Sequence, residues 1–380
     1  MGHTIDQDSG FIFPDTHDER ELIKVIGVGG GGGNAVNHLF EQGVKGVTFC
    51  MINTDNQALK QSPVPMKIVM GGRGAGGKPE VAKRAAEQCK EAIETMLDDG
   101  TKMVFITASM GGGTGTGAGP VVAKFAHDQG LLTVAIVNTP FHFEGHNKMK
   151  MAIEGIRQMQ QHVDAMIVIN NQRLVDNYEE LPMSRCFALA DDVLAQAANA
   201  ISNLISIDGY WNIDFNDVRS TLHEARAAII SEGVGEGEHR VTKALNAALE
   251  SPLLRNRNIY DATRLLINIY CNPDAEKPLV AREVRELEEF KRKFRKEDNQ
   301  ITGWTYDRTM GEEVKITILA SGFEINLDEE GENDIILLGP EDDDPDQLDI
   351  IENTPTYQRG LQTISPEPPI EKPKKKITWQ

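Results

Sequence analysis

The sequence has few cysteines, no long hydrophobic run and no basic targeting region, and each absence removes a class of protein. Its four cysteines are far apart and form no CxxC pair, which disfavours a disulfide framework or a cysteine-based metal site. No stretch of about 18 apolar residues occurs, the length that a membrane-spanning helix needs. The acidic N-terminus also lacks the basic and apolar regions of a signal peptide. We therefore expect a cytoplasmic chain without direct membrane insertion.

Positive charge is also scarce. The 39 lysines and arginines are outnumbered by 58 aspartates and glutamates, which gives a formal net charge of -19 at pH 7. Such a chain repels nucleic acids and anionic lipid surfaces, so we expect no nucleic acid among its partners. Any phosphate group that binds here must be held by backbone dipoles and a metal ion.

Glycine, in contrast, is abundant and concentrated. The densest run lies between the apolar Met103–Ile106 and the helix-like Pro120–Ala123, and it comprises Gly111, Gly112, Gly113, Thr114, Gly115, Thr116 and Gly117. A strand that ends in a loop of small residues and continues as a helix brings backbone N–H groups and the positive helix end to one point. The alternative is a flexible turn between two ordinary elements. We favour a phosphate site, because other glycine runs repeat the arrangement.

A similar succession of strand, glycine run and helix occurs near the N-terminus. The apolar Leu22–Ile26 precedes a run in which Gly27, Gly29 and Gly32 match the G-x-G-x-x-G pattern of dinucleotide-binding folds. Taken alone, this pattern is weak. It makes a nicotinamide-dependent oxidoreductase the alternative function at this point.

A third glycine run follows the apolar Met66–Met70. Its Gly72–Lys78 fits G-x-x-x-x-G-K, but Pro79 occupies the position of the Ser or Thr that holds magnesium in a P-loop, so we reject that interpretation. Pro79 instead suits the first position of a helix. A metal site at His142 and His146 is also disfavoured, because their order is not HExxH and no third ligand is evident.

Strands and helices alternate through the first half, with further apolar strands at Leu131–Val137 and Ala165–Ile169. This order predicts an α/β fold with a doubly wound, Rossmann-like sheet that gathers its ligand-binding loops at the carboxyl ends of the strands. A helical apolar period from 185 to 206 predicts a long central helix, in which Asp191 could face a nucleotide. The second half predicts a smaller α+β domain, followed by a disordered tail.

Taken together, the motifs resemble those of the tubulin superfamily and, most closely, the FtsZ family of bacterial cell-division proteins. The resemblance spans roughly residues 20 to 325. It rests on Gly111–Gly117, which resembles the GGGTGTG signature of the superfamily, and on matches at Gly29–Asn34, Asn53–Asp55, Gly74–Gly76, Pro140–Gly145 and Asn212–Arg219.

The resemblance implies a GTPase that converts GTP to GDP and phosphate and assembles head to tail into protofilaments of the division ring at midcell. Mg²⁺ would accompany the nucleotide. We accordingly divide the chain into a mobile N-terminal arm (1–20), a GTP-binding domain (21–184), a central helix with a catalytic acidic loop (185–221), a C-terminal α+β domain (222–339) and a disordered acidic and proline-rich tail (340–380).

The resemblance also implies nucleotide-binding residues. The phosphates would lie on Gly111 to Gly117 and on the first glycine run, with the third run nearby, here Gly30, Gly31, Gly32, Gly33, Asn34, Ala75 and Gly76. Glu144 would contact the ribose and Lys148 would lie near the phosphates, while Phe187 would stack on the base. Asn171 and Asp191 would read the guanine edge, because a carboxylate that accepts hydrogen bonds from the guanine N1–H and 2-amino groups rejects adenine.

For catalysis, the resemblance places Asn212, Asp214 and Asp217 in an acidic loop that meets the γ-phosphate bound by a neighbouring subunit. Hydrolysis would then depend on assembly. From the residues alone, Asp214 could instead be a helix N-cap. Two other functions stay open, the oxidoreductase and a tubulin-like filament protein that binds nucleotide without hydrolysing it.

Several positions depart from the family pattern. Lys148 stands where an arginine is common, and Gln172 where an aspartate is usual, so we expect altered nucleotide affinity. Glu224–Gly233 is more polar than usual. Residues Ile370–Gln380 lack the short peptide that docks a membrane-tethering partner and other division proteins in this family. Either the chain is truncated or this contact has diverged.

Overall fold

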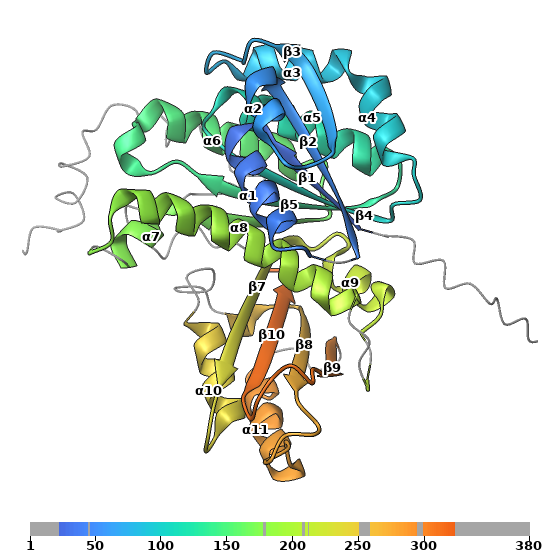
Figure 1. The fold of residues 1–380 in the computed structure, drawn as a ribbon, viewed down its shortest axis with the longest axis vertical. Helices are drawn as coiled ribbons and strands as arrows, with labels where there is room; N and C mark the ends of the chain where they lie inside the picture. Colours follow the sequence, from blue (N-terminus) through green and yellow to red (C-terminus); the bar gives the residue numbers. More distant parts are fainter. Residues whose placement is uncertain are drawn as a thin grey trace, which may run out of the picture. The chain divides into compact units, whose positions relative to one another are not determined.

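The computed structural model describes residues 23–323, apart from residue 45 and residues 178–179, 207–209, 212, 251–258 and 295–298. The predicted N-terminal arm at 1–20 and the predicted tail at 340–380 therefore lie outside the described residues. In the described part, one sheet joins its strands in the order β3-β2-β1-β4-β5-β6-β7-β10-β8-β9 (Figure 1). The strands are β1 (Ile23–Val28), β2 (Val47–Asp55), β3 (Met66–Gly72), β4 (Met103–Ser109), β5 (Leu132–Thr139), β6 (Ala165–Asn170), β7 (Arg226–Gly235), β8 (Arg264–Cys271), β9 (Gln300–Tyr306) and β10 (Val314–Ser321).

The helices connect these strands and cover them. They are α1 (Gly29–Glu41), α2 (Asn56–Gln61), α3 (Pro79–Gln88), α4 (Lys90–Leu97), α5 (Gly113–Asp128), α6 (His146–Gln160), α7 (Asn171–Asn177), α8 (Met183–Ser206), α9 (Phe215–Leu222), α10 (Arg240–Leu249) and α11 (Ala281–Lys291), with 3-10 turns η1 (His142–Glu144) and η2 (Ile259–Asp261). Pro79 begins α3, as predicted. Helix α3 ends at Gln88, and α4 begins at Lys90 as a separate element.

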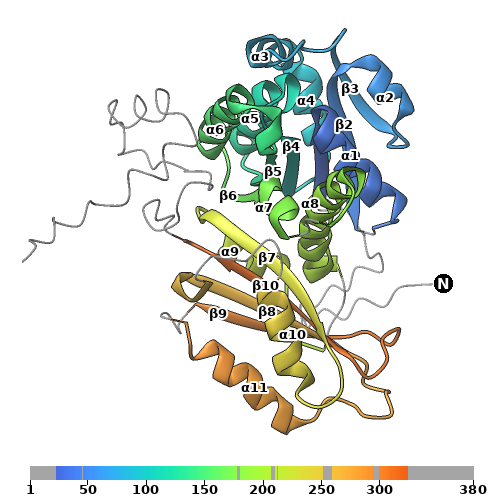
Figure 2. The same ribbon diagram turned by 90° about the vertical axis from the view of Figure 1, so that its left-hand side faces the viewer.

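The N-terminal half of the sheet is parallel from β3 to β7 and has the strand order of a Rossmann fold. Strands β1, β4 and β5 are buried along nearly their whole length, as expected of apolar strands covered on both faces. Helices α1 and α8 pack on one face, and α5 with α3, α4 and α6 covers the other (Figure 2). The predicted α/β fold with a doubly wound sheet is confirmed.

The glycine runs predicted as loops are largely helical. Helix α1 already begins at Gly29 and α5 at Gly113, each close to the end of a strand. Side chains are excluded there by the strand backbone, because a Cβ at Gly32 would lie 2.1 Å from the carbonyl oxygen of Thr107. A Cβ at Gly115 would lie 2.3 Å from that of Ser109. Glycine therefore lets both helices start directly against the sheet.

Strand β7 belongs to both halves of the sheet. It pairs with β6 in parallel only at Ala165–Arg226 and Met166–Ala227, and with β10 in antiparallel along the whole of β10. The expected α+β domain therefore shares one sheet with the first half, with α10 and α11 on one side and α8 and α9 on the other. Its edge strand β9 was missed, because Gly303 interrupts the pattern and glycine is depleted in strands.

The predicted central helix is α8, which spans 24 residues. At a rise of about 1.5 Å per residue its length is about 36 Å. It packs on α1 and crosses β5, β6 and β7, and its buried side includes Leu194, Ile201 and Leu204. None of the described helices is both long and apolar enough to cross a membrane. Helix α8 thus extends from the parallel strands to the shared strand β7.

Candidate functional site

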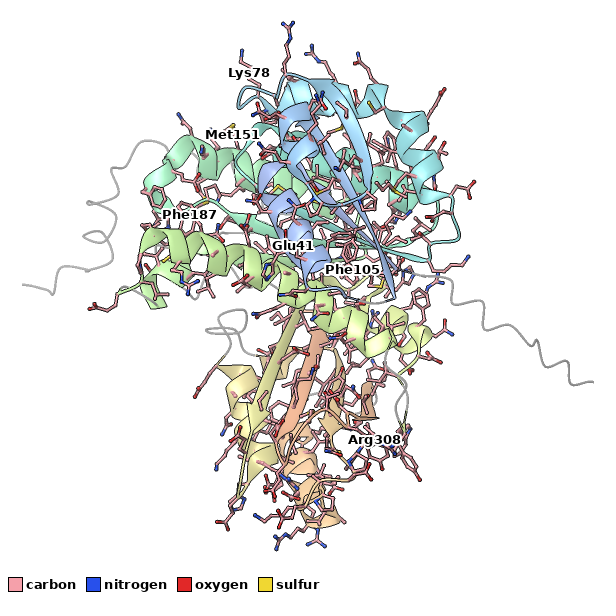
Figure 3. All side chains as sticks on the ribbon, in the orientation of Figure 1. Glu41, Lys78, Phe105, Met151, Phe187 and Arg308 are labelled. Carbon is pink, nitrogen blue, oxygen red and sulfur yellow. The ribbon has the colours of Figure 1, made fainter. Side chains whose placement is uncertain are left out.

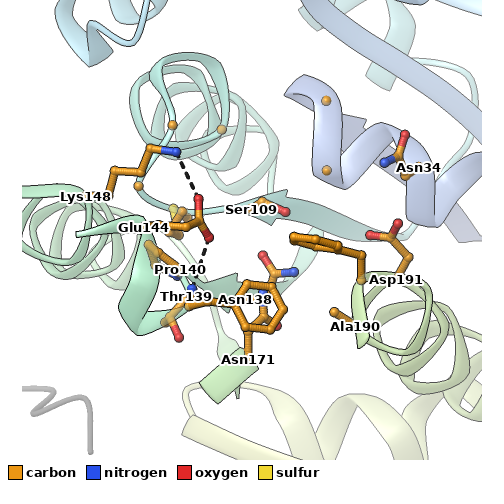
Figure 4. A pocket seen from close by; sticks show the side chains of 18 of the residues that line it. Asn34, Ser109, Asn138, Thr139, Pro140, Glu144, Lys148, Asn171, Ala190 and Asp191 are labelled. Carbon is orange, nitrogen blue, oxygen red and sulfur yellow. Dashed lines mark hydrogen bonds and ion pairs between the residues drawn. The ribbon is translucent and has the colours of Figure 1, made fainter. Parts of the chain in front are cut away.

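A cavity of about 450 Å³ lies at the carboxyl ends of β4, β5 and β6 (Figure 4). This is where a doubly wound sheet places its ligand, at the edge to which all the parallel strands point. The lining combines bare backbone, polar side chains and aromatic rings. It consists of Gly30, Gly31, Asn34, Ser109, Met110, Gly111, Gly112, Gly113, Thr114, Gly115, Asn138, Thr139, Pro140, Phe141, Glu144, Lys148, Asn171, Phe187, Ala190 and Asp191.

Two helix N-termini converge on the cavity. Gly30 and Gly31 lie in the first turn of α1, while Gly113 begins α5, so the free N–H groups and positive dipole ends of both helices face one space. A Cβ at Gly30 or Gly112 would meet no atom within 4 Å, so the backbone there is open to a ligand. Anions bind at such helix ends. This side of the cavity therefore suits phosphate groups.

Three buried polar atoms of the opposite wall lack a hydrogen-bond partner within the described part of the chain. They are Asn138 Oδ1 and Thr139 Oγ1, from the end of β5, and Asn171 Oδ1, from the start of α7. A buried polar group without a partner costs about 1–3 kcal/mol. The wall is therefore prepared for a ligand that carries hydrogen-bonding groups at that side.

Asp191 faces the cavity from α8, opposite Asn34 of α1 (Figure 4). Burial raises the pKa of its carboxyl group to about 6, although a hydrogen bond from Asn34 acts in the opposite direction. The neighbouring Asp192 also raises this pKa, while His38 lowers it. The wall thus holds a partly desolvated acceptor, whose charge a ligand with N–H donors would stabilise.

Aromatic rings form the rim beside Asp191. Phe187, in the first turns of α8 (Figure 3), is half exposed, and its ring centroid lies 5.1 Å from that of the buried Phe141 in an edge-to-face arrangement. Phe143 stacks on Phe141 at 5.3 Å. A flat ligand can stack on such a rim.

Glu144 and Lys148 pair with each other at the edge of the cavity. Lys148 Nζ lies 2.9 Å from Glu144 Oε2, and the other carboxylate oxygen accepts a hydrogen bond of 3.0 Å from the backbone N–H of Phe141 (Figure 4). Both side chains are partly exposed. A carboxylate therefore already balances the charge of this ammonium group, which lies at the edge of the cavity.

Six of the nucleotide-binding residues predicted from the sequence do not line the cavity: Gly32, Gly33, Ala75, Gly76, Thr116 and Gly117. Several of them pack elements together instead. The Thr116 hydroxyl accepts a hydrogen bond of 2.9 Å from the N–H of Gly111, and a Cβ at Gly117 would lie 2.0 Å from the carbonyl oxygen of Pro79. Ala75 lies against Gly113. Thr116, Gly117 and Ala75 therefore pack around the first turns of α5 without lining the cavity.

Other lining residues were not among the predicted ones: Ser109, Met110, Asn138, Thr139, Pro140, Phe141 and Ala190. Most of them end a strand or follow it directly. The rule that parallel strands present ligands at their carboxyl ends would have found Ser109, Asn138 and Thr139.

The predicted catalytic acids lie away from the cavity, beyond the opposite end of α8. Asp214 Oδ1 accepts a hydrogen bond of 2.9 Å from the N–H of Asp217, and Asp217 Oδ2 accepts one of 3.0 Å from the N–H of Asp214. This reciprocal capping box begins α9. The second oxygen of each carboxylate has no partner in the described part of the chain. Asn212, the third predicted residue, lies outside the described residues.

Comparison with protein families gives two matches that together cover most of the described residues. Residues 22–179 match the GTPase domain of the Tubulin/FtsZ family. Residues 226–324 match the C-terminal domain of the FtsZ family. The cavity lies in the first match, apart from its α8 residues, and the β7–β10 part of the sheet lies in the second.

Individual relatives agree with the family matches. The chain is 46% identical to the cell division protein FtsZ of Porphyromonas gingivalis over 90% of this chain and 74% of that protein. An FtsZ dimer of M. jannaschii is similar in structure, with a TM-score of 0.71 and 36% identity over 79% of this chain and 88% of that chain. CetZ2 from Haloferax volcanii, at 20% identity and a TM-score of 0.66 over 80% of this chain and 93% of that chain, shares the fold.

These findings decide between the functions left open by the glycine patterns. The G-x-G-x-x-G pattern lies inside the matched GTPase domain, so the oxidoreductase alternative is set aside. The C-terminal domain of the FtsZ family follows that GTPase domain in the same chain. The chain belongs to the FtsZ family of tubulin-like GTPases.

Proposed function

We propose that the cavity binds GTP and that hydrolysis takes place only where the acidic capping box of one copy meets the cavity of the next. The chain is a polymerising GTPase by family. The observation that carries the proposal is the separation of its two halves. The cavity adjoins the start of α8, whereas Asp214 and Asp217 follow its end, and about 22 Å of helix separates Asp191 from Ser206. One chain cannot bring both to one phosphate.

At the guanine end, Asp191 would accept hydrogen bonds from the N1–H and 2-amino groups of the base. The unpaired Oδ1 atom of Asn171 offers a further acceptor in the same wall. Adenine presents no such pair of donors, so it would leave buried oxygen atoms unpaired. The half-exposed ring of Phe187 would stack on the base. Selection for guanine follows from these groups.

At the phosphate end, the N–H groups of α1 and α5 would hold the phosphates. Each helix end carries about half a positive charge, and both charges act on one small volume. Lys148 would add a point charge if its ammonium group shifts from Glu144 to a phosphate oxygen, which would leave Glu144 free to bind the ribose. Binding of GTP would thus replace the Lys148–Glu144 pair.

Mg²⁺ would bind with the nucleotide. The phosphate side is lined by backbone and hydroxyl groups, including Ser109 and Thr114, which suit a hydrated magnesium ion held mainly by phosphate oxygens. The ion would neutralise charge on the phosphate oxygens. Chelation with EDTA should therefore stop turnover and weaken triphosphate binding more than diphosphate binding.

In the second copy, the free carboxylate oxygens of Asp214 and Asp217 would orient and polarise the attacking water. Their other oxygens already hold the start of α9, so both groups are fixed before they meet a substrate. Loss of the γ-phosphate then alters the surface between the two copies. Because a relative of this chain is a cell division protein, we further propose that the filament acts at the division site.

The experiment measures GTP turnover against protein concentration. Specific activity should be near zero at low concentration and rise above a threshold, and the purified protein should release guanine nucleotide when it is denatured. Asp217→Asn should still bind GTP, but its turnover rate should fall by about 100-fold or more, as is usual when an acid-base group is lost. Glu250→Gln, an exposed neutralisation at the end of α10, serves as the control and should act normally.

Three results would oppose the proposal. Activity proportional to protein from the lowest concentration would show hydrolysis within one chain. Normal turnover of Asp217→Asn would show that the capping box takes no part in catalysis. Assembly with bound GTP but no turnover in the unmodified chain would favour the filament protein that does not hydrolyse its nucleotide.

A further inference from the structure

The exposed aromatic side chains of the described part gather at two places, and each adjoins one half of the proposed active site. Beside the acidic capping box, Tyr210 and Trp211 are 79% and 71% exposed, and the ring of Tyr306 lies 5.5 Å from that of Tyr210. We call these three residues the aromatic ledge. Beside the cavity, Phe143 is 64% exposed, next to Phe187. Exposed apolar groups that cluster in this way mark contact surfaces.

The aromatic ledge is joined to the edge of the sheet through the backbone of Trp211. The N–H of Trp211 donates to the carbonyl oxygen of Trp304 at 3.1 Å, and the N–H of Trp304 donates back at 2.9 Å. Trp304 lies in β9, the last strand of the sheet. The backbone at Trp211 is therefore held in place before any partner arrives, which lowers the entropy cost of a contact.

The polar groups beside the two aromatic groups can form hydrogen bonds with each other. Asp214 and Asp217 follow Tyr210 and Trp211 within a few residues. Around Phe143, the exposed side chains of His142, His146 and Lys148 supply nitrogen donors. Surfaces that pair apolar groups at the centre with polar groups around them are typical of specific contacts.

We propose that the aromatic ledge of one copy packs against Phe143 of the next copy and anchors their head-to-tail contact. The inference rests on the proposed function, which brings Asp214 to the neighbouring cavity. Trp211 precedes Asp214 by three residues and so lies within about 10 Å of it. Phe143 directly precedes Glu144, which lines the cavity. Contact of the acids with the cavity therefore brings the two aromatic groups together.

The first test measures the threshold concentration for turnover. Trp211→Ser and Phe143→Ser should each raise it about ten-fold, as loss of an aromatic contact at an interface does. The combined variant should raise it little further than either alone, since both changes remove one contact. The control is Val234→Thr, an exposed position on β7 with a similar change in polarity, and it should leave the threshold unchanged. Additive effects of the two serine variants would contradict a direct contact.

The second test is a cross-link, which does not depend on a loss of activity. In a Cys89→Ser background the remaining native cysteines are buried, so Tyr210→Cys and Phe143→Cys supply the accessible thiols. A mixture of the two variants should form dimers with a short bismaleimide in the presence of GTP, whereas a mixture with Val234→Cys in place of Phe143→Cys should not.

The outcomes separate this inference from the proposed function. If filaments sediment and Asp217→Asn lacks turnover, while the cross-link is missing and the serine variants have normal thresholds, the ledge contact is wrong and the shared active site stands. If Asp217→Asn turns over GTP normally, the proposed function fails, and a cross-link would then show only that the two surfaces meet.

Discussion

Asp191 combines a cost in stability with a proposed gain in binding. Burial raises its pKa to about 6, so at neutral pH the carboxylate is held in a charged form that its surroundings disfavour. Asp191→Asn should therefore raise the Tm of the nucleotide-free protein. It should also weaken GTP binding about 100-fold and reduce the preference for GTP over ATP. Thermal unfolding and nucleotide competition measure the two effects. An unchanged preference for guanine would contradict the assigned role.

The raised pKa of Asp191 predicts that both the stability of the protein and its binding of nucleotide depend on pH. An unfolded aspartate has a pKa of about 3.9, below that of the folded group, so the stability contributed by Asp191 falls as pH rises from about 4 to 6. Nucleotide binding should change in the opposite sense, because the protonated carboxyl loses an acceptor as pH falls through about 6. GTP titrations between pH 5 and 8 measure this step. Asp191→Asn is the control and should lack it.

For single residues, the sequence could indicate the phosphate side but not its limits. Gly112 and Gly117 belong to one run, yet one faces open space and the other packs against Pro79. Sequence pattern cannot separate a glycine that leaves room for a ligand from one that leaves room for another helix. Asn138 and Thr139 give no pattern of their own, and only the pairing of β4, β5 and β6 shows that they share a wall.

This distinction gives a prediction for α5. Gly117→Ala should destabilise the protein by more than about 2 kcal/mol, since its Cβ would overlap the backbone of α3 and overpacking cannot relax there. Gly112→Ala is the matched comparison: its Cβ meets no protein atom, so the fold should keep its stability while GTP binding weakens. Denaturant unfolding and GTP titration of both variants test these two expectations. Equal loss of stability would contradict the assignment.

The start of α9 allows the structural and catalytic roles of Asp214 to be separated. The structure confirms that Asp214 is an N-cap, the alternative raised by its sequence position. Asn caps a helix as well as Asp, whereas Ala costs about 1 kcal/mol. Asp214→Asn should therefore keep the stability of the protein and lose turnover, while Asp214→Ala should lose both. Normal turnover of the Asn variant would leave capping as the residue's whole function.

Among the elements, those with strong apolar patterns were predictable. The long period of α8 and the apolar runs of β4 and β5 indicated their type and approximate position. Helix starts were predicted too late at the glycine runs, since glycine normally weakens helices and only contact with the sheet compensates. Strand β9 depends on its pairing with β8, which a local pattern does not contain.

For the whole molecule, a shared site predicts complementation between two defective copies. Asp191→Asn keeps its acidic capping box, and Asp217→Asn keeps its cavity. Mixed in equal amounts, they should regain turnover up to about a quarter of the normal level, because one in four random head-to-tail contacts joins an intact cavity to an intact capping box. Phosphate release from the mixture, compared with each variant alone, measures this. No gain on mixing would argue against a site built from two copies.

Assembly was the least predictable property from the residues themselves. The sequence shows both halves of the proposed site, but not that α8 holds them apart. The division into domains ending at 184, 221 and 339 stays a prediction, since β7 pairs with strands of both halves. The aromatic ledge could not be predicted from the sequence either, because Tyr306 lies beside Tyr210 only through its place at the end of β9.

The placement of cavity and capping box at opposite ends of α8 has a last consequence. A row of n such molecules would hold n nucleotides but only n minus one completed sites, so the terminal molecule whose cavity is uncovered would keep its triphosphate until another arrives. The two ends of the row would then differ chemically. One end would carry an unhydrolysed triphosphate, and the other would expose the carboxylates of a capping box that covers no cavity. Growth itself would decide the age of every nucleotide along the row.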